Sequence, residues 1–174
     1  SIIEKTFWNS VKKFKVTNIA GVPFNFEILD RLGLIDRNLC NIRFFTQAGG
    51  RLEEDIIKRI SSILKKKNIN FFIMYGQTEA APRISYLSLN DFPKKIGSVG
   101  KVVSGGKLSI NKSNNEIIYE GLNIFRGYSK NRGDLSKLNH ISKLYTGDKG
   151  YLDNEKFLYI TGRINREIKI YGKR

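Results

Sequence analysis

The chain has 174 residues, of which 40% are hydrophobic and 27% charged, and no apolar run approaches the roughly 18 residues of a membrane span, so disordered and membrane-spanning classes are excluded. Its formal net charge of +15 invites a nucleic-acid interpretation, but the lysines are dispersed from Lys5 to Lys173, which argues against nucleic acid as a partner. Cys40 is the only cysteine, which excludes an intrachain disulfide and fits a reducing, cytoplasmic setting.

The first half of the chain alternates helical and strand patterns. The clearest helix carries one apolar stripe from Leu52 to Leu64, with acidic residues in its first turn and three lysines in its last. Both charge clusters complement the helix dipole. Shorter patterns of helical or strand length surround this helix. The predicted elements are a helix over 2–14, a strand over 16–20, a helix over 24–33, a strand over 42–46, a helix over 52–67 and a strand over 70–75.

After about Pro93 the glycines recur and no long helical stripe is found. Short β-prone segments lie between the glycines, and this pattern favours an antiparallel lobe shaped as a small distorted β-barrel. The predicted strands cover residues 107–110, 116–119, 157–160 and 167–171.

The predicted fold class is therefore α/β followed by β, with a partial parallel sheet, flanking helices and then the antiparallel lobe. Strands that alternate with helices are the basis for the parallel sheet. We place the α/β lobe at residues 1–92 and the β lobe at residues 93–163, with a boundary expected near residues 88–95.

The stretch Tyr75-Gly76-Gln77-Thr78-Glu79 directly follows the last predicted strand of the first half. Ligands of open parallel α/β sheets bind beyond the carboxyl ends of the strands, where this stretch lies. Tyr75 could offer a flat face to a planar base, and Gly76 could let the backbone approach a ligand. Thr78 could bond a phosphate oxygen, and Glu79 could hold Mg²⁺. The alternative is an ordinary strand-to-loop turn with a solvated glutamate.

Two stretches in the second half give weaker signals. Thr146-Gly147-Asp148 is predicted as a tight turn whose carboxylate could accept hydrogen bonds from two vicinal hydroxyls, as on a ribose. Its alternative is a hairpin turn in which the aspartate bonds its own backbone. Arg163 follows Gly162 directly, and its planar fork suits phosphate or ribose oxygens, or else a surface ion pair in a basic strand.

A fourth stretch, Thr46 to Leu52, holds Gly49 and Gly50 between a strand end and a helix start. There the backbone could approach a ligand beside the first N–H groups of the helix. A plain turn between strand and helix explains the same residues equally well.

Together these stretches resemble the adenylate-forming enzymes, the superfamily of acyl-CoA synthetases, luciferases and peptide-synthetase adenylation domains. The resemblance covers about Val16 to Arg174 and depends on five motifs in the family's order. The motifs are Gly49-Gly50, Tyr75 to Glu79, Gly97-Ser98-Val99-Gly100, Tyr145 to Asp148, and the Gly-Arg-x-x-Arg-x-Ile-Lys-Ile-x-Gly-x-Arg run from Gly162. The segment from Glu116 through Gly121 to Gly127-Tyr128 fits the same pattern between the third and fourth motifs.

The resemblance implies roles for residues of the second, fourth and fifth motifs. Tyr75 would stack on adenine, Thr78 would contact the α-phosphate and Glu79 would bind Mg²⁺. Asp148 would hold the ribose hydroxyls, and Arg163 would contact the nucleotide.

Further residues take their implied roles from their places in the motifs. Those expected to bind nucleotide are Gly76, Gln77, Gly49, Gly50 and Arg51, the last three also flanking the acyl group. The segment Val16–Phe24 would line the acyl pocket, where Phe24, Phe26 and Ala80-Ala81 could form an apolar wall or belong to the core. Asn165 would be the hinge residue.

The resemblance also implies the reaction. The family activates a carboxylic acid with ATP to give an acyl-adenylate and pyrophosphate, and a thiol then takes the acyl group. The implied cofactors are ATP and Mg²⁺, with CoA as co-substrate, and the implied partners are a small-molecule carboxylic acid, a nucleotide, and CoA or a carrier-protein thiol. Gln77 and the segment from Asn115 to Tyr128 favour acid–thiol ligases over peptide-synthetase domains, which more often carry Pro at the Gln77 position.

Two parts of the family pattern are expected outside these residues: a Ser/Thr/Gly-rich phosphate loop upstream, and a lid with the adenylation lysine downstream. We therefore expect the chain to be a fragment of the large N-terminal domain, inactive by itself, with residues 164–174 as hinge and start of the lid. Two alternatives stay open, a basic nucleic-acid-binding module and a split or degenerate homologue that serves as a binding or scaffold piece.

Overall fold

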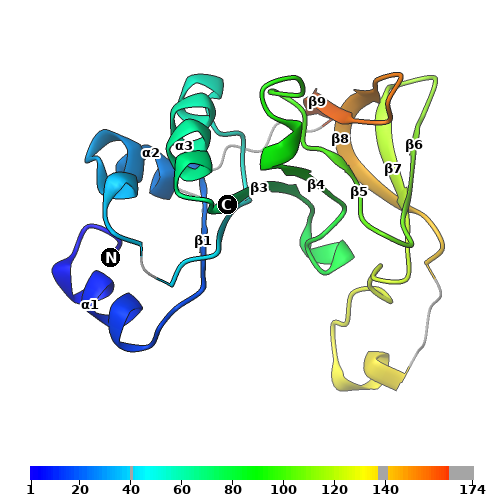
Figure 1. The fold of residues 1–174 in the computed structure, drawn as a ribbon. Helices are drawn as coiled ribbons and strands as arrows, with labels where there is room; N and C mark the ends of the chain where they lie inside the picture. The colour runs from blue at the N-terminus through cyan, green and yellow to red at the C-terminus, as the bar shows by residue number, and fades with distance from the viewer. Residues whose placement is uncertain (40, 137–140, 165–174) are drawn as a thin grey trace.

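The computed structural model describes residues 1–39, 41–136 and 141–164. Within these residues the chain forms a five-stranded mixed sheet with flanking helices, and a four-stranded antiparallel sheet that curls into a half-barrel. Figure 1 shows the helices on the left and the second sheet on the right. The predicted fold class, α/β followed by β, is confirmed.

The first sheet has the strand order β1-β2-β3-β4-β5. The first three strands are parallel, as predicted, and the last two run antiparallel to their neighbours. The fifth strand lies beyond the boundary expected near residues 88–95. The first sheet therefore includes one strand from the expected β lobe. The division of the chain at residue 92 stays a prediction. The strands are β1 (Asn18–Gly21), β2 (Phe44–Gln47), β3 (Asn70–Tyr75), β4 (Ser85–Ser88) and β5 (Lys101–Val102).

Each α-helix falls on a predicted one, with ends shifted by a few residues. Pro23 occupies the first turn of its helix, where its missing N–H costs nothing. The same helix ends before Gly33, which takes a left-handed φ of 59° that stops the helix. The helices are α1 (Lys5–Lys13), α2 (Pro23–Arg31) and α3 (Glu54–Lys66), with short 3₁₀ turns η1 (Leu34–Asp36), η2 (Thr78–Ala80), η3 (Leu89–Asp91) and η4 (Arg132–Ser136).

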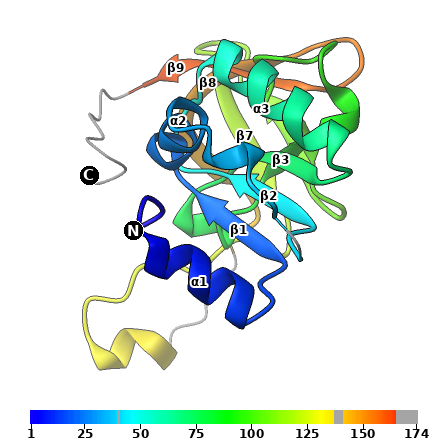
Figure 2. The same cartoon turned by 60° about the vertical axis from the view of Figure 1, so that its left-hand side comes forward.

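The first core lies between the first sheet and helices α2 and α3, which Figure 2 shows close together over β1 and β2. Phe26 of α2 packs against Phe45 and Phe71 of the sheet with ring centroids 6.3 and 5.3 Å away. Burial of each such side chain contributes about 1.5–3 kcal/mol to folding. At the surface Arg59 of α3 contacts Asp30 of α2 at 2.7 Å, which joins the two helices but adds little stability there.

The second sheet is an antiparallel meander of four strands in chain order. Three of them fall on predicted strands, whereas the longest, at residues 144–152, was not predicted. The predicted strand over 167–171 lies outside the described residues. The strands are β6 (Lys107–Ile110), β7 (Glu116–Glu120), β8 (Leu144–Leu152) and β9 (Leu158–Arg163).

The prediction of a tight turn at Thr146-Gly147-Asp148 is wrong, because these residues lie inside β8. The strand instead bulges there. Glu116 of β7 pairs with Lys149 and Ile118 with Tyr145, so β8 carries extra residues between the two pairs. Gly147 takes a φ of 71°, which a glycine adopts without steric cost.

The segment Gly97–Gly100 joins the first sheet to β9. The Ser98 hydroxyl donates to the carbonyl of Leu158 at 2.7 Å, and the Leu158 N–H donates to the carbonyl of Gly100 at 2.8 Å. Nearby, the Lys95 ammonium contacts the carboxylates of Asp153 at 2.7 Å and Glu155 at 2.6 Å. These hydrogen bonds and ion pairs connect the two sheets in addition to the apolar packing between them.

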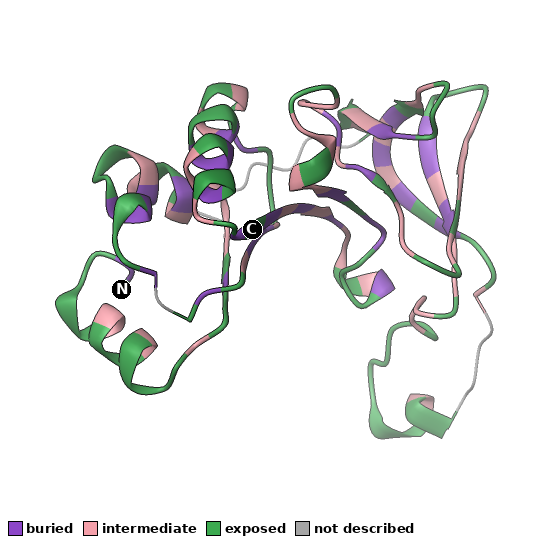
Figure 3. Ribbon diagram, viewed as in Figure 1, coloured by how far each residue is buried: buried purple, intermediate pink, exposed green. Residues whose placement is uncertain are grey.

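The second core lies on the side of the first sheet that faces the second sheet. It contains Tyr75, Ala80 and Ile84 from the first half, with Ile117, Tyr119, Leu144 and Leu158 from the second. Figure 3 shows these buried stretches on the strands, whereas the segment that follows β7 is largely exposed. Among the residues that the structure describes, no helix has the length and apolar character needed to cross a bilayer.

Candidate functional site

The stretch Tyr75 to Glu79 leaves the first sheet at the carboxyl end of its parallel strands, where the sequence predicted it. Tyr75 is the last residue of β3, and Thr78 and Glu79 begin the short turn η2. Thr78 is exposed and Glu79 half-buried, so both side chains reach the surface beyond the strand end.

Three predicted site residues from both sheets form one connected group. The Tyr75 hydroxyl donates to Asp148 Oδ2 at 2.8 Å, across 73 positions of sequence. Arg163 Nε lies 2.7 Å from Asp148 Oδ1. The pairing of β8 with β9 places Asp148 directly opposite Arg163, so the sheet register itself brings the ion pair together. We call Tyr75, Asp148 and Arg163 the inter-sheet group.

The electrostatics of this group keep the tyrosine as a donor. Burial raises the pKa of Tyr75 well above its usual range, and the negative charge of Asp148 raises it further. The phenol therefore stays protonated and donates to the carboxylate. With Arg163 on its other oxygen, the buried charge of Asp148 is compensated. A carboxylate offers about four lone-pair sites, so Asp148 can accept further hydrogen bonds from hydroxyl groups.

The bulge in β8 is held by side chains whose positioning role the sequence did not reveal. The Gly147 N–H donates to Glu116 Oε1 at 3.0 Å. The Thr146 hydroxyl donates to the carbonyl of Ile117 at 2.8 Å and accepts the Asp148 N–H at 3.2 Å. Glu116 and Thr146 are both buried. The sequence showed Glu116 only as part of the family pattern, because its contact depends on the pairing of two distant strands.

The structure explains the glycine at position 76 by close backbone packing, whereas the sequence led us to expect close approach to a ligand. A Cβ at Gly76 would lie 2.4 Å from the carbonyl carbon of Pro82 and 2.7 Å from the backbone N of Arg83. The Ile84 N–H also donates to the carbonyl of Tyr75 at 2.9 Å. The loop from residue 76 to residue 83 thus closes on itself, and only a residue without a side chain fits at its start.

Glu79 is oriented from the segment that follows β7. The Tyr128 hydroxyl donates to Glu79 Oε1, and the Phe125 N–H donates to the Glu79 carbonyl at 2.8 Å. Gln77, between this residue and Tyr75, is half-buried. The described residues contain no group of three or more His, Cys, Asp or Glu side chains that could hold a metal ion.

The glycine turn lies beyond the end of β2, at the same sheet edge as Tyr75. Gly49 takes a φ of 86°, and the carbonyl of Gly50 accepts a hydrogen bond from the Gln47 amide at 2.9 Å. Gly49, Gly50 and Arg51 are all exposed, and Arg51 contacts Glu54 at 3.1 Å. The predicted hinge residue Asn165 lies outside the described residues.

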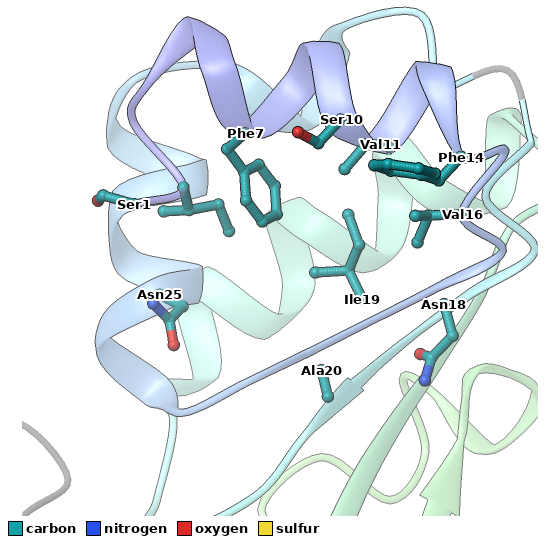
Figure 4. Close-up of a pocket in the computed structure, with 11 residues that line it drawn as sticks. Ser1, Phe7, Ser10, Val11, Phe14, Val16, Asn18, Ile19, Ala20 and Asn25 are labelled. Carbon is teal, nitrogen blue, oxygen red and sulfur yellow. The ribbon is translucent and has the colours of Figure 1, made fainter.

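A hollow of about 470 Å³ lies between α1 and β1 (Figure 4). Its wall is mainly apolar, with Phe7, Val11 and Ile19 directed into the space. Residues 16 and 18–20 of the expected acyl-pocket segment contribute to it. For Phe26 and Ala80 the sequence allowed either a place in the pocket wall or a place in the core. Neither residue has exposed surface, so the core interpretation is confirmed for both.

The fold is that of an α/β protein with a second, antiparallel sheet. Its candidate site combines polar groups at the carboxyl ends of the parallel strands with an aspartate and an arginine from the antiparallel sheet. The chain belongs to the AMP-binding enzyme family, whose model matches residues 2–129.

Alignments with curated relatives cover most of this chain. It is 32% identical over 165 residues to a 2-succinylbenzoate–CoA ligase of Oceanobacillus iheyensis, an alignment of 90% of this chain and 33% of the relative. An oxalate–CoA ligase of Arabidopsis thaliana is 29% identical over 186 residues, which covers 97% of this chain and 34% of the relative. The chain thus spans about a third of the length of the curated relatives it matches.

A solved structure supports the same assignment. The o-succinylbenzoate CoA synthetase of Bacillus subtilis, in complex with ATP and a magnesium ion, matches with a TM-score of 0.75 at 27% identity. The match covers 94% of this chain and 34% of the synthetase.

Proposed function

We propose that this chain forms part of an AMP-forming carboxylic acid ligase. Such an enzyme joins a carboxylic acid and ATP into an acyl-adenylate with release of pyrophosphate, and then transfers the acyl group to a thiol, here CoA. The observation that carries the proposal is the inter-sheet group, because it brings three residues of three separate family motifs into direct contact at the expected ligand end of a parallel sheet.

Within the proposed site, Asp148 accepts the ribose hydroxyls and the guanidinium of Arg163 contacts the nucleotide. Only 8% of Tyr75 is exposed, so it can offer adenine only a small part of its ring. We therefore give greater weight to its hydroxyl, which holds Asp148, and stacking on adenine stays a prediction. Gly76, Gln77 and the glycine turn from Gly49 to Arg51 would border the nucleotide from the sheet edge.

The donors present fit Mg²⁺ delivered with ATP. Magnesium is usually held by one or two carboxylates together with phosphate oxygens and water. Glu79 supplies one half-buried carboxylate, and Thr78 beside it would face the α-phosphate. Bound magnesium would neutralise phosphate charge, which a carboxylate nucleophile must otherwise approach against repulsion. The residues of this chain would orient the nucleotide, as positioning is a large part of such catalysis.

The names of the relatives support CoA as the thiol acceptor and a small carboxylic acid as the substrate. A carrier-protein thiol is the alternative acceptor. The hinge at Asn165 and the division into lobes at residues 92 and 163 are also part of this proposal.

The test is exchange of labelled pyrophosphate into ATP by the protein expressed from its own gene. We expect exchange that depends on a carboxylic acid and falls at least about a hundredfold in a Glu79→Gln variant. A screen would begin with 2-succinylbenzoate and oxalate. Exchange without any acid, or undiminished exchange in the variant, would contradict the proposal.

A second measurement distinguishes the ligase proposal from the alternative of a nucleic-acid-binding module. The chain is titrated with ATP and with a short DNA duplex at two salt concentrations. A basic nucleic-acid module predicts steeply salt-dependent duplex binding. The ligase proposal predicts saturable ATP binding and only weak association with DNA.

A further inference from the structure

We propose that Tyr128 is a positioning residue for Glu79, and this inference rests on the proposed function. Its hydroxyl donates to Glu79 Oε1, although 49 positions separate the two residues and Tyr128 itself is largely exposed. An exposed tyrosine whose hydroxyl is directed at one carboxylate oxygen is well placed to select a single orientation of that carboxylate.

The contact is built by the segment from Gly121 to Tyr128, which leaves β7 and crosses to η2. The Asn123 side-chain amide donates to the carbonyls of Ala80 at 2.7 Å and Arg83 at 2.8 Å. The buried Tyr119 hydroxyl holds Asn123 through its Oδ1 at 2.6 Å. The segment is thus attached to the turn that carries Glu79 by several bonds, which fixes the starting point for Tyr128.

The C-terminal end of the segment orients the ring of Tyr128. The Phe125 N–H donates to the Glu79 carbonyl, and the Phe125 ring meets the Tyr128 ring edge to face with centroids 4.8 Å apart. Gly127 takes a φ of 122°, a conformation that favours glycine, and so lets the chain turn immediately before Tyr128. Figure 1 shows this segment as the yellow-green stretch below the second sheet, where the loop that continues to η4 begins.

A hydroxyl suits this task better than a cation would. It donates a single hydrogen bond and so occupies only one of the lone-pair sites of the carboxylate. A hydroxyl also brings no formal positive charge of its own to the carboxylate. Lysine or arginine in the same place would orient the carboxylate but would compete with the cation.

The test compares ATP binding in Mg²⁺ and in EDTA for the wild-type chain, Tyr128→Phe and Tyr145→Phe. Both variants lose only a hydroxyl from an exposed tyrosine, and Tyr145 lies on β8. We expect Tyr128→Phe to reduce the gain in affinity that Mg²⁺ provides by about tenfold, the equivalent of one hydrogen bond to a charged group. Affinity in EDTA should not change, and Tyr145→Phe should match the wild type in both conditions.

The outcomes distinguish this inference from the proposed function. Equal Mg²⁺ gains in Tyr128→Phe and the wild type, with ATP still bound, would overturn the role of Tyr128 alone. A uniform loss of affinity in both conditions would also overturn it, because that indicates general damage to the fold. Failure of the wild-type chain to bind ATP in either condition would overturn the proposed function as well.

Discussion

Replacement of Asp148 by asparagine is expected to weaken ATP binding about a hundredfold. The substitution removes the negative charge that would accept two ribose hydroxyls, and each such charge-assisted bond contributes about 1.5–3 kcal/mol. It also leaves Arg163 without the carboxylate that lies 2.7 Å from its Nε. A nucleotide site that lacks both the acceptor and the orientation of its arginine should retain only weak contacts with the base and phosphates.

The measurement is calorimetric titration of ATP into the chain, with circular dichroism to confirm folding. The matched control is Asp153→Asn, which removes a carboxylate from the loop after β8 that contacts Lys95 instead. Tyr75→Phe tests the group from its other side, because it removes only the donor to Asp148, and we expect a loss of about tenfold. Equal affinities in Asp148→Asn and Asp153→Asn would contradict the assignment of Asp148 to the nucleotide.

Replacement of Gly100 by alanine is expected to cost at least about 3 kcal/mol of unfolding free energy. A Cβ at Gly100 would lie 1.7 Å from the Tyr86 carbonyl oxygen and 2.3 Å from the Leu87 backbone N, inside the first sheet. Gly100 also has a φ of 86°, which alanine adopts only with strain. The adjacent bonds to Leu158 join the two sheets, so the disturbance should reach the inter-sheet group.

Gly105→Ala is the control for the backbone contribution alone. Gly105 has a similar φ of 78°, but no heavy atom lies within 4 Å of its added Cβ. We expect a loss of about 1 kcal/mol there, measured for both variants by urea-induced unfolding. Similar losses in the two variants would show that strain, not the contact with Tyr86, explains the glycine at position 100.

The elements that could be predicted from sequence are those with local signals. The strand over residues 70–75 was found with its bounds, because a short apolar run ends at Tyr75-Gly76. Helix α3 was found from its apolar stripe and the charges at its ends. The position of Thr78 and Glu79 beyond a strand end followed directly from that strand.

The features that could not be predicted depend on pairing between distant residues. The bulge that contains Asp148 exists because β8 pairs with β7 in a shifted register and Glu116 binds the Gly147 N–H, so the same residues were taken for a tight turn. The bonds from Tyr75 to Asp148 and from Tyr128 to Glu79 carry no periodic signal. Only the family resemblance brought Tyr75, Asp148 and Arg163 into one predicted site.

The central claim is that residues from both sheets form a single nucleotide site. Amide chemical shifts of the chain during a titration with AMP test it most directly. We expect changes at Tyr75 in the first sheet and at Asp148 and Arg163 in the second, all saturating with one common Kd. Changes confined to one sheet, changes with different Kd values, or weak changes spread over the surface lysines would contradict the claim.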